Sequence, residues 1–254
     1  RQLLFVSGKG GTGKTTVAAA IADLAVQHGK RTLVCEMDAK GALAAAFEVG
    51  ALGFQPTELQ PGLHAMVMNT EDSLREYLRL FVRIPLVGRI GPLAHTFDFV
   101  ADAAPGVKEI LAIGKLCYEV RERHYDLVVV DAEASGHIVA QIDAPRAIRE
   151  LVHVGMVRDQ TDWMLDILGD HARTGLVVVA TPEEMPVTET VELVAKVQAT
   201  TAVDVAAVIA NRVLPQWFPD AEGEVFDALL QRPAQEALAA ATGAKVAPVF
   251  HAAS

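Results

Sequence analysis

Residues 8–16, which read GKGGTGKTT, place four glycines, two lysines and three threonines in one short stretch. The glycines permit a tight turn in which successive backbone N–H groups approach a polyphosphate. In the pattern G-x-x-x-x-G-K-[ST], Lys14 would reach the β- and γ-phosphates, and the Thr15 hydroxyl would bind Mg²⁺. The stretch therefore predicts a phosphate-binding loop for a magnesium nucleotide. The alternative is a glycine-rich turn that only precedes a helix.

This loop needs a strand before it and a helix after it, and the sequence supplies both. Residues 3–6 form a continuous apolar run, as expected of a central parallel strand covered on both faces. The alanine-rich residues 17–27 predict a helix that begins near Gly13 and ends near His28, with Gly29 as a left-handed cap. The positive end of that helix would also attract phosphate. Residues 31–36 would then complete a right-handed βαβ unit.

A second lysine, Lys9, follows the first glycine of the loop. This arrangement resembles the "deviant" Walker A motif of the MinD, ParA and arsenite-pump ATPases. The resemblance implies that Lys9 reaches the phosphates of the nucleotide in a facing subunit, and hence that a dimer holds nucleotide between its subunits. A cation beside a polyphosphate would neutralise charge that builds up during phosphoryl transfer. The alternative is a solvated loop lysine.

Asp38 follows the predicted second strand at its carboxyl end, where ligands bind in open α/β sheets. Residues 37–40, MDAK, resemble the switch I segment of the arsenite-pump and tail-anchored-protein-targeting ATPases, in which the aspartate orients or activates the attacking water. Ala39 stands where those families have proline. The alternative for Asp38 is a cap for a helix that starts near Gly41.

Residues 125–131 form an apolar run that ends in Asp131, which is the Walker B arrangement. Asp131 would hold Mg²⁺ through water. Residues 131–137, DAEASGH, resemble the switch II segment of the same family, and Gly136 fits a loop that approaches the γ-phosphate. Glu133 stands where a small residue is usual, and its carboxylate would repel that phosphate. His137 is interpreted as stabilising the loop.

The strand predicted at residues 203–210 ends at Asn211, whose amide the resemblance implies reads the adenine base. A turn asparagine is the alternative. Residues 182–190, which include Glu189, resemble the segment after the corresponding strand of arsenite-pump ATPases. The nucleotide-binding residues that we expect are Gly8, Lys9, Gly10, Gly11, Thr12, Gly13, Lys14, Thr15, Thr16 and Asn211. The catalytic residues would be Lys9, Lys14 and Asp38, and the metal-binding residues Thr15 and Asp131.

The other elements follow from periodicity and from breakers. Residues 41–49 predict a short helix, 53–62 a loop, 63–69 a weak strand and 176–180 a buried strand. A helical insertion at about residues 70–124 would contain a helix capped by Thr70, a helix near 93–100 and a helix at 107–120. Later helices are expected from Asp143-Ala144-Pro145, around Trp163, from about Pro186, at 222–230 and at 234–241.

The composition limits the classes of partner. The 254 residues are 51% hydrophobic and carry a net charge of −10, which argues against nucleic acid or an anionic membrane as the main partner. The two cysteines, Cys35 and Cys117, form no C-x-x-C pair, so neither a zinc clip nor a thiol cluster for a soft metalloid such as arsenite is visible. No signal-peptide pattern or spanning apolar run occurs, so we expect a cytoplasmic protein without an integral membrane segment.

Together these patterns predict a single doubly wound α/β domain over residues 1–254, a P-loop ATPase with a mainly parallel sheet. We expect that the native N-terminus and the C-terminal part of the family domain are missing from this numbering. The resemblance to the arsenite-pump (ArsA-like, anion-transporting) ATPases implies that ATP and Mg²⁺ close a homo- or heterodimer and that hydrolysis reopens it, to handle an unidentified protein partner. The alternatives are a MinD/ParA-like positioning ATPase and, because of Glu133, a nucleotide-gated scaffold with little hydrolysis.

Overall fold

The computed structural model describes residues 1–82, 106–151, 155–215, 227–228 and 231–242. Its strands are β1 Leu3–Gly8, β2 Thr32–Glu36, β3 Thr57–Gln60, β4 Leu63–Val67, β5 Leu127–Asp131, β6 Thr174–Ala180 and β7 Val205–Ala210. Within this part of the chain they form one seven-stranded sheet in the order β3-β4-β2-β5-β1-β6-β7. Every neighbouring pair is parallel except β3 and β4.

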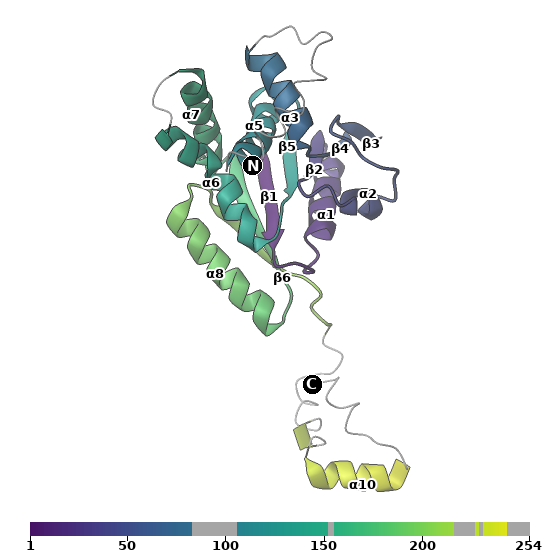
Figure 1. Cartoon of the computed structure of the whole chain (residues 1–254). Helices are drawn as coiled ribbons and strands as arrows, with labels where there is room; N and C mark the ends of the chain where they lie inside the picture. The colour runs from purple at the N-terminus through teal and green to yellow at the C-terminus, as the bar shows by residue number, and fades with distance from the viewer. Residues whose placement is uncertain (83–105, 152–154, 216–226, 229–230, 243–254) are drawn as a thin grey trace. The chain divides into compact units, whose positions relative to one another are not determined.

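Helices of the unit that contains the sheet lie on both of its faces (Figure 1). The helices of the described residues are α1 Lys14–Gln27, α2 Ala42–Ala46, α3 Thr70–Tyr77, the π-helical turn η1 Leu78–Val82, α5 Val107–Arg121, α6 Ser135–Leu151, α7 Met156–Leu168, α8 Glu184–Thr200 and α10 Arg232–Thr242. Helices α1 and α2 pack on one face, and α5 to α8 pack on the other. The predicted doubly wound α/β fold is therefore confirmed.

The central strands alternate between two cores. In β1, Leu3 and Phe5 point into the core below α5 to α8, whereas Val6 points into the core below α1 and α2. In β5, Val128 and Val129 divide in the same way. Because both faces of these strands are buried, they read in the sequence as unbroken apolar runs.

The region predicted as a loop at residues 53–62 contains a strand. β3 pairs antiparallel with β4 at the edge of the sheet, and Gly62 turns the chain between them with a φ of +85°. In the sequence TELQ only Leu59 is apolar. An edge strand needs few apolar side chains, because little of it is buried. The prediction was wrong because the pairing is supplied by the backbone of β4, which no local pattern reveals.

Helix α6 begins eight residues before the predicted start at Asp143. The pair Ala144-Pro145 resembles a helix N-terminus, but Pro145 lies inside the helix. Burial of Ile138 and Ile142 against the sheet stabilises the earlier turns, and it outweighs the backbone hydrogen bond that a proline cannot donate. As a consequence Gly136 lies in the first turn of α6 and not in a flexible loop.

The helical segments between β4 and β5 agree with expectation over the described residues, apart from the cap. Asn69, not Thr70, caps α3: its extended backbone precedes the helix and its Oδ1 accepts a hydrogen bond from the Asp72 N–H at 3.0 Å. The helix expected near 93–100, and most of the one expected at 222–230, lie outside the described residues. Helix α10 matches the helix predicted at 234–241.

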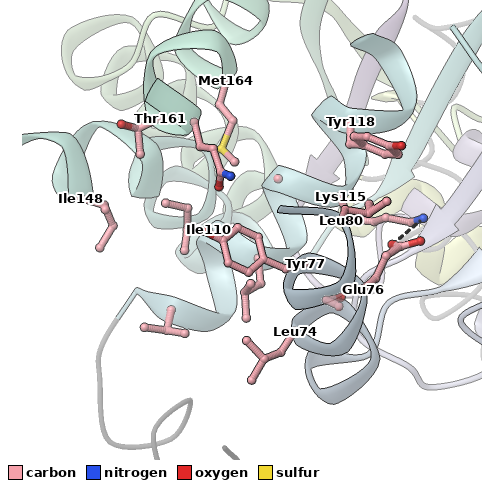
Figure 2. Close-up of a pocket in the computed structure, with 15 residues that line it drawn as sticks. Leu74, Glu76, Tyr77, Leu80, Ile110, Lys115, Tyr118, Ile148, Thr161 and Met164 are labelled. Atoms are coloured by element: carbon pink, nitrogen blue, oxygen red, sulfur yellow. Dashed lines mark ion pairs between the residues drawn. The ribbon is translucent and has the colours of Figure 1, made fainter. Parts of the chain in front are cut away.

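An apolar cavity of about 280 Å³ lies among α3, η1, α5, α6 and α7 (Figure 2). Its lining includes Leu74, Tyr77, Leu80, Ile110, Ile148 and Met164. At its edge the Lys115 ammonium lies 2.7 Å from the carboxylates of both Glu76 and Glu119. We refer to this feature below as the helical cavity.

The chain divides into two compact units, Arg1–Arg212 and Val213–Ser254. The first unit contains the sheet, the helices α1 to α8 and all residues of the predicted site. The described part of the second unit contains α10. None of the helices in the described part of the chain has the length and apolar character needed to cross a membrane.

Candidate nucleotide-binding site

The loop between β1 and α1 depends on glycine at two close approaches. A Cβ atom on Gly8 would lie 2.1 Å from the carbonyl oxygen of Val179 in β6, and one on Gly13 would lie 2.3 Å from the Asn211 amide nitrogen. Both glycines also have positive φ angles, +151° and +92°. The glycines predicted from the sequence thus let the loop lie against its neighbours.

Three hydrogen bonds fix the carbonyl groups of this loop. The Thr12 hydroxyl donates to the Lys9 carbonyl at 2.9 Å, and the Lys14 ammonium is 3.4 Å from the same oxygen. The Asn211 side-chain amide donates to the Thr12 carbonyl at 2.8 Å, which connects the end of β7 to the loop. The tertiary fold therefore brings Asn211 to the loop that precedes it by nearly 200 positions.

The N-terminus of α1 is open to an anion. Gly13 precedes the helix without a side-chain cap, and no acidic residue lies in the first turn. The amide N–H groups of that turn have no intrahelical acceptor, and they carry the positive end of the helix dipole. Burial lowers the pKa of Lys14, while nearby Asp131 raises it. The lysine is thus a cation without a carboxylate in direct contact, at the N-terminus of a helix.

Thr15 and Asp131 form a pair of oxygen ligands. The Thr15 hydroxyl donates to Asp131 Oδ2 at 2.6 Å, whereas Oδ1 of the same carboxylate is buried and has no hydrogen-bond partner among the described residues. Burial raises the pKa of Asp131, and the hydrogen bond from Thr15 lowers it in part. Mg²⁺ prefers hard oxygen ligands, so these two side chains fit the cation that the sequence analysis expects.

The loop after β2 is organised by Glu36, a residue that the sequence analysis missed. Its buried carboxylate accepts hydrogen bonds from the backbone N–H groups of Lys40 at 2.8 Å, Ala42 at 3.1 Å and Leu43 at 3.0 Å. Glu36 therefore caps α2, the role considered as the alternative for Asp38. An acidic residue at the end of the apolar run TLVCE is the signal that could have indicated it.

Asp38 itself is exposed and forms an ion pair with Lys40. Burial sets the direction of the pKa shifts of Lys14 and Asp131, and the charge of nearby Asp38 adds a small contribution to each. Between the two paired residues, Ala39 has a φ of +42°, which a proline ring does not permit. The proline that the switch I segment of the similar families has at this position could therefore not replace Ala39 in this conformation of the loop.

Lys9 is bound to an acidic residue of its own chain. Its ammonium lies 2.7 Å from Glu189 Oε1, on α8. The other carboxylate oxygen of Glu189 accepts a hydrogen bond from the Ser135 hydroxyl, at the start of α6, at 3.3 Å. The hydrogen bond from Lys9 lowers the pKa of Glu189. The sequence analysis noted the segment around Glu189 but assigned it no contact with Lys9.

Glu133 lies in the turn between β5 and α6, and its side chain contacts residues of α6. Its carboxylate accepts a hydrogen bond from the Gln141 amide at 2.9 Å and lies 3.9 Å from His137 Nδ1, while its backbone carbonyl accepts one from the Ser7 hydroxyl at 2.9 Å. These contacts give the carboxylate partners within its own segment.

The two cysteines are core residues. Cys35 and Cys117 are both buried and free, and burial raises the pKa of each thiol to about 12. Over the described residues no group of three or more His, Cys, Asp or Glu side chains is arranged to hold a metal ion. Burial therefore keeps both thiols protonated at neutral pH.

Comparison with known proteins agrees with this geometry. A model of the family described as anion-transporting ATPase matches residues 1–161 and 147–232. The ATPase BagA of Mycobacterium tuberculosis is 30% identical over 241 residues, which cover 88% of this chain and 70% of BagA. A candidate arsenical pump-driving ATPase of Aquifex aeolicus is 24% identical over 249 residues, which cover 85% of this chain and 81% of that protein.

The ATPase ASNA1 homolog 1 of Paramecium tetraurelia is 26% identical over 148 residues, which cover 58% of this chain and 44% of that protein. The family match spans the whole first unit, including the loop at residues 8–16, Asp131 and Asn211, and it extends to residue 232. It confirms the resemblance inferred from the sequence motifs. The chain belongs to the anion-transporting ATPase family and is an ATP-hydrolysing enzyme.

Proposed function

We propose that this enzyme binds ATP together with Mg²⁺ at residues 8–16 and hydrolyses it there. The observation that supports this most directly is the buried, unpartnered Oδ1 of Asp131 beside the Thr15 hydroxyl. Mg²⁺, when bound, would neutralise charge on the phosphate oxygens. Thr15 would hold the cation directly and Asp131 through water, while Lys14 and the amides of the loop bind the phosphates.

Asp38 would orient or activate the water that attacks the γ-phosphate. Its position after β2, close to Lys14 and Asp131, supports this role. Glu36 would act as its positioning residue, because it fixes the backbone of the loop through the Lys40 and Ala42 amides. A carboxylate within reach of the water can accept a proton as the new P–O bond forms.

Adenine would be read by Asn211. One N–H of its amide is bound to the Thr12 carbonyl, which sets the direction of the side chain. The amide oxygen remains as an acceptor for the exocyclic amino group of adenine, and guanine offers a carbonyl at that place. Preference for ATP over GTP would follow.

We further propose that the enzyme acts as a dimer in the cytoplasm. Lys9 would reach the phosphates bound by a facing subunit, homologous or identical, and its partly exposed side chain supports this reach. ATP binding would close the dimer and hydrolysis would reopen it, which would drive the handling of a protein partner. The two free buried thiols are consistent with a reducing compartment.

The test compares wild-type protein with Lys14→Ala in ATP calorimetry and in phosphate release. We expect a loss of about a hundredfold or more in phosphate release, the usual effect of removing a preorganised group that stabilises charge. Lys30→Ala, which removes an exposed lysine beyond the end of α1, is the matched control and should behave as wild type. Equal rates for wild type and Lys14→Ala would reject the proposed site.

The dimer has its own test. Sedimentation velocity with Mg²⁺ and a non-hydrolysable ATP analogue should show a concentration-dependent dimer that is absent without nucleotide. Lys9→Ala should weaken that dimer while leaving the analogue bound to each subunit. A monomer under all of these conditions would contradict the role of Lys9 in a facing subunit.

A further inference from the structure

Glu189 connects three elements of the candidate site. It lies in α8, its Oε1 pairs with the Lys9 ammonium of the phosphate-binding loop at 2.7 Å, and its Oε2 accepts from Ser135, the first residue of α6, at 3.3 Å. α6 follows directly on the turn after Asp131. One carboxylate therefore contacts the loop that binds phosphate and the helix that follows the metal-binding strand.

The Glu189 carboxylate and a bound phosphate group would compete for the positive charge of Lys9. Phosphate carries more negative charge than a carboxylate, so a bound triphosphate would compete for this lysine. The side chains of Lys9 and Glu189 are 27% and 34% exposed, which makes their ion pair weak and readily exchanged. The contact is thus suited to being replaced when nucleotide enters.

We propose that Glu189 is a positioning residue that holds Lys9 away from the phosphates until nucleotide binds, and so raises the ATP concentration needed for occupancy. The inference rests on the proposed function of Lys9. It applies whether Lys9 reaches the phosphates of its own subunit or those of a facing one, because in both cases the phosphates compete with Glu189 for the lysine. After it leaves, Glu189 keeps its hydrogen bond from Ser135.

The experiment measures the half-saturating concentration of a non-hydrolysable ATP analogue with Mg²⁺, by calorimetry on the full chain. Glu189→Gln removes the charge, and Glu189→Asp keeps the charge but shortens the side chain so that it no longer reaches Lys9. Both should lower the half-saturating concentration about two- to fivefold, the range expected from an exposed ion pair. Glu192→Gln, an exposed glutamate on the same helix, should have no effect.

Two further measurements distinguish positioning from other effects. The difference in half-saturating concentration between Glu189→Gln and wild type should shrink as the salt concentration rises, since screening weakens the ion pair that the substitution removes. It should also vanish in a Lys9→Ala background, where there is no ammonium to hold. If Glu189→Gln still lowers the half-saturating concentration in the Lys9→Ala background, Glu189 repels the phosphate directly and the proposal is overturned.

The remaining outcomes are also decisive. Half-saturating concentrations equal to wild type, or higher, for both Glu189 variants would overturn the positioning role while leaving nucleotide binding intact. If wild type itself binds no analogue, and Lys14→Ala is indistinguishable from it, the proposed function fails and this inference fails with it. Thermal unfolding of each variant identifies any that do not fold. Because two substitutions are made at Glu189, the second one still tests the proposal if the first does not fold.

Discussion

The phosphate-binding loop and the helical cavity each contain a lysine that is at least partly buried, but the two lysines have different surroundings. Lys115 contacts two carboxylates, those of Glu76 and Glu119, at 2.7 Å each. Burial lowers its pKa, but the hydrogen bonds to those carboxylates outweigh burial and the pKa is raised. Lys14 has no carboxylate in contact, and burial lowers its pKa.

The comparison distinguishes a lysine that stabilises the fold, Lys115, from a lysine that is available to a ligand, Lys14. Lys115 is satisfied by the protein, and it also lies over the Phe54 ring at 5.3 Å from the ring centroid. Around the loop, by contrast, the described structure leaves the amides of the α1 N-terminus and Asp131 Oδ1 without protein partners, and it leaves Lys14 without a carboxylate in contact. Unsatisfied polar groups cost stability, and they are retained where a ligand completes them.

Lys115→Met should show the largest effect on folding. It leaves Glu76 and Glu119 without their cation, and breaking a buried pair in this way costs about 3–5 kcal/mol in the free energy of unfolding. Urea unfolding measures this loss, with the exposed Lys196→Ala as control. Affinity for the ATP analogue should not change in the folded variant, and a loss of affinity would contradict the separation of the two regions.

The same lysine predicts an alkaline transition. Because the pKa of Lys115 is raised in the folded protein, its contribution to stability is complete below the unfolded pKa of about 10.4 and is lost as pH rises through the folded value. Stability should therefore fall above that pH more steeply in wild type than in Lys115→Met. Parallel unfolding curves for the two proteins between pH 9 and pH 11 would show that Lys115 does not contribute in this way.

Asp131→Asn should separate function from stability at the other region. We expect Mg²⁺-dependent affinity for the ATP analogue to fall on the order of tenfold to a hundredfold, as for other groups that hold a metal through water. Without nucleotide and Mg²⁺ the variant should be at least as stable as wild type, because an unpartnered buried carboxylate oxygen has been removed. A clear loss of stability would place Asp131 among the structural charges. Calorimetry and thermal unfolding provide the two measurements.

Glu36→Gln tests a buried acid whose partners are all backbone amides. The neutral amide accepts the three hydrogen bonds less strongly, so we expect a loss of about 1–3 kcal/mol in stability. Phosphate release should fall as well, while affinity for the analogue stays close to wild type, because the loop that carries Asp38 becomes less ordered. Unchanged turnover would mean that Glu36 only caps α2.

Glu133→Ala should have the smallest effect. The carboxylate already has Gln141 as a partner and lies near His137, so its removal should change phosphate release by no more than about threefold, the size of an exposed polar contact. The scaffold alternative expects a large rise in turnover once the repelling charge is gone. A tenfold rise in steady-state phosphate release would favour that alternative.

The parts of the fold that were predicted correctly have local causes. The apolar runs of β1 and β5, the glycines between β1 and α1, and the alanine-rich α1 each determine their own conformation within a few residues. β3 was missed because its pairing depends on β4, and the start of α6 was misplaced because burial on the sheet overcomes Pro145. Both errors arise from tertiary contacts that override local preference.

The sequence by itself determined the family, the α/β fold and the residues expected to bind nucleotide, because glycine spacing and strand-ending acids are read directly along the chain. Only the tertiary structure decided which of these residues have partners. Glu36 turns to cap α2, Glu189 pairs with Lys9, and Asn211 contacts Thr12. Charge–charge and hydrogen-bonding contacts act over a few ångströms in space, and the fold alone brings positions far apart in the chain within that distance.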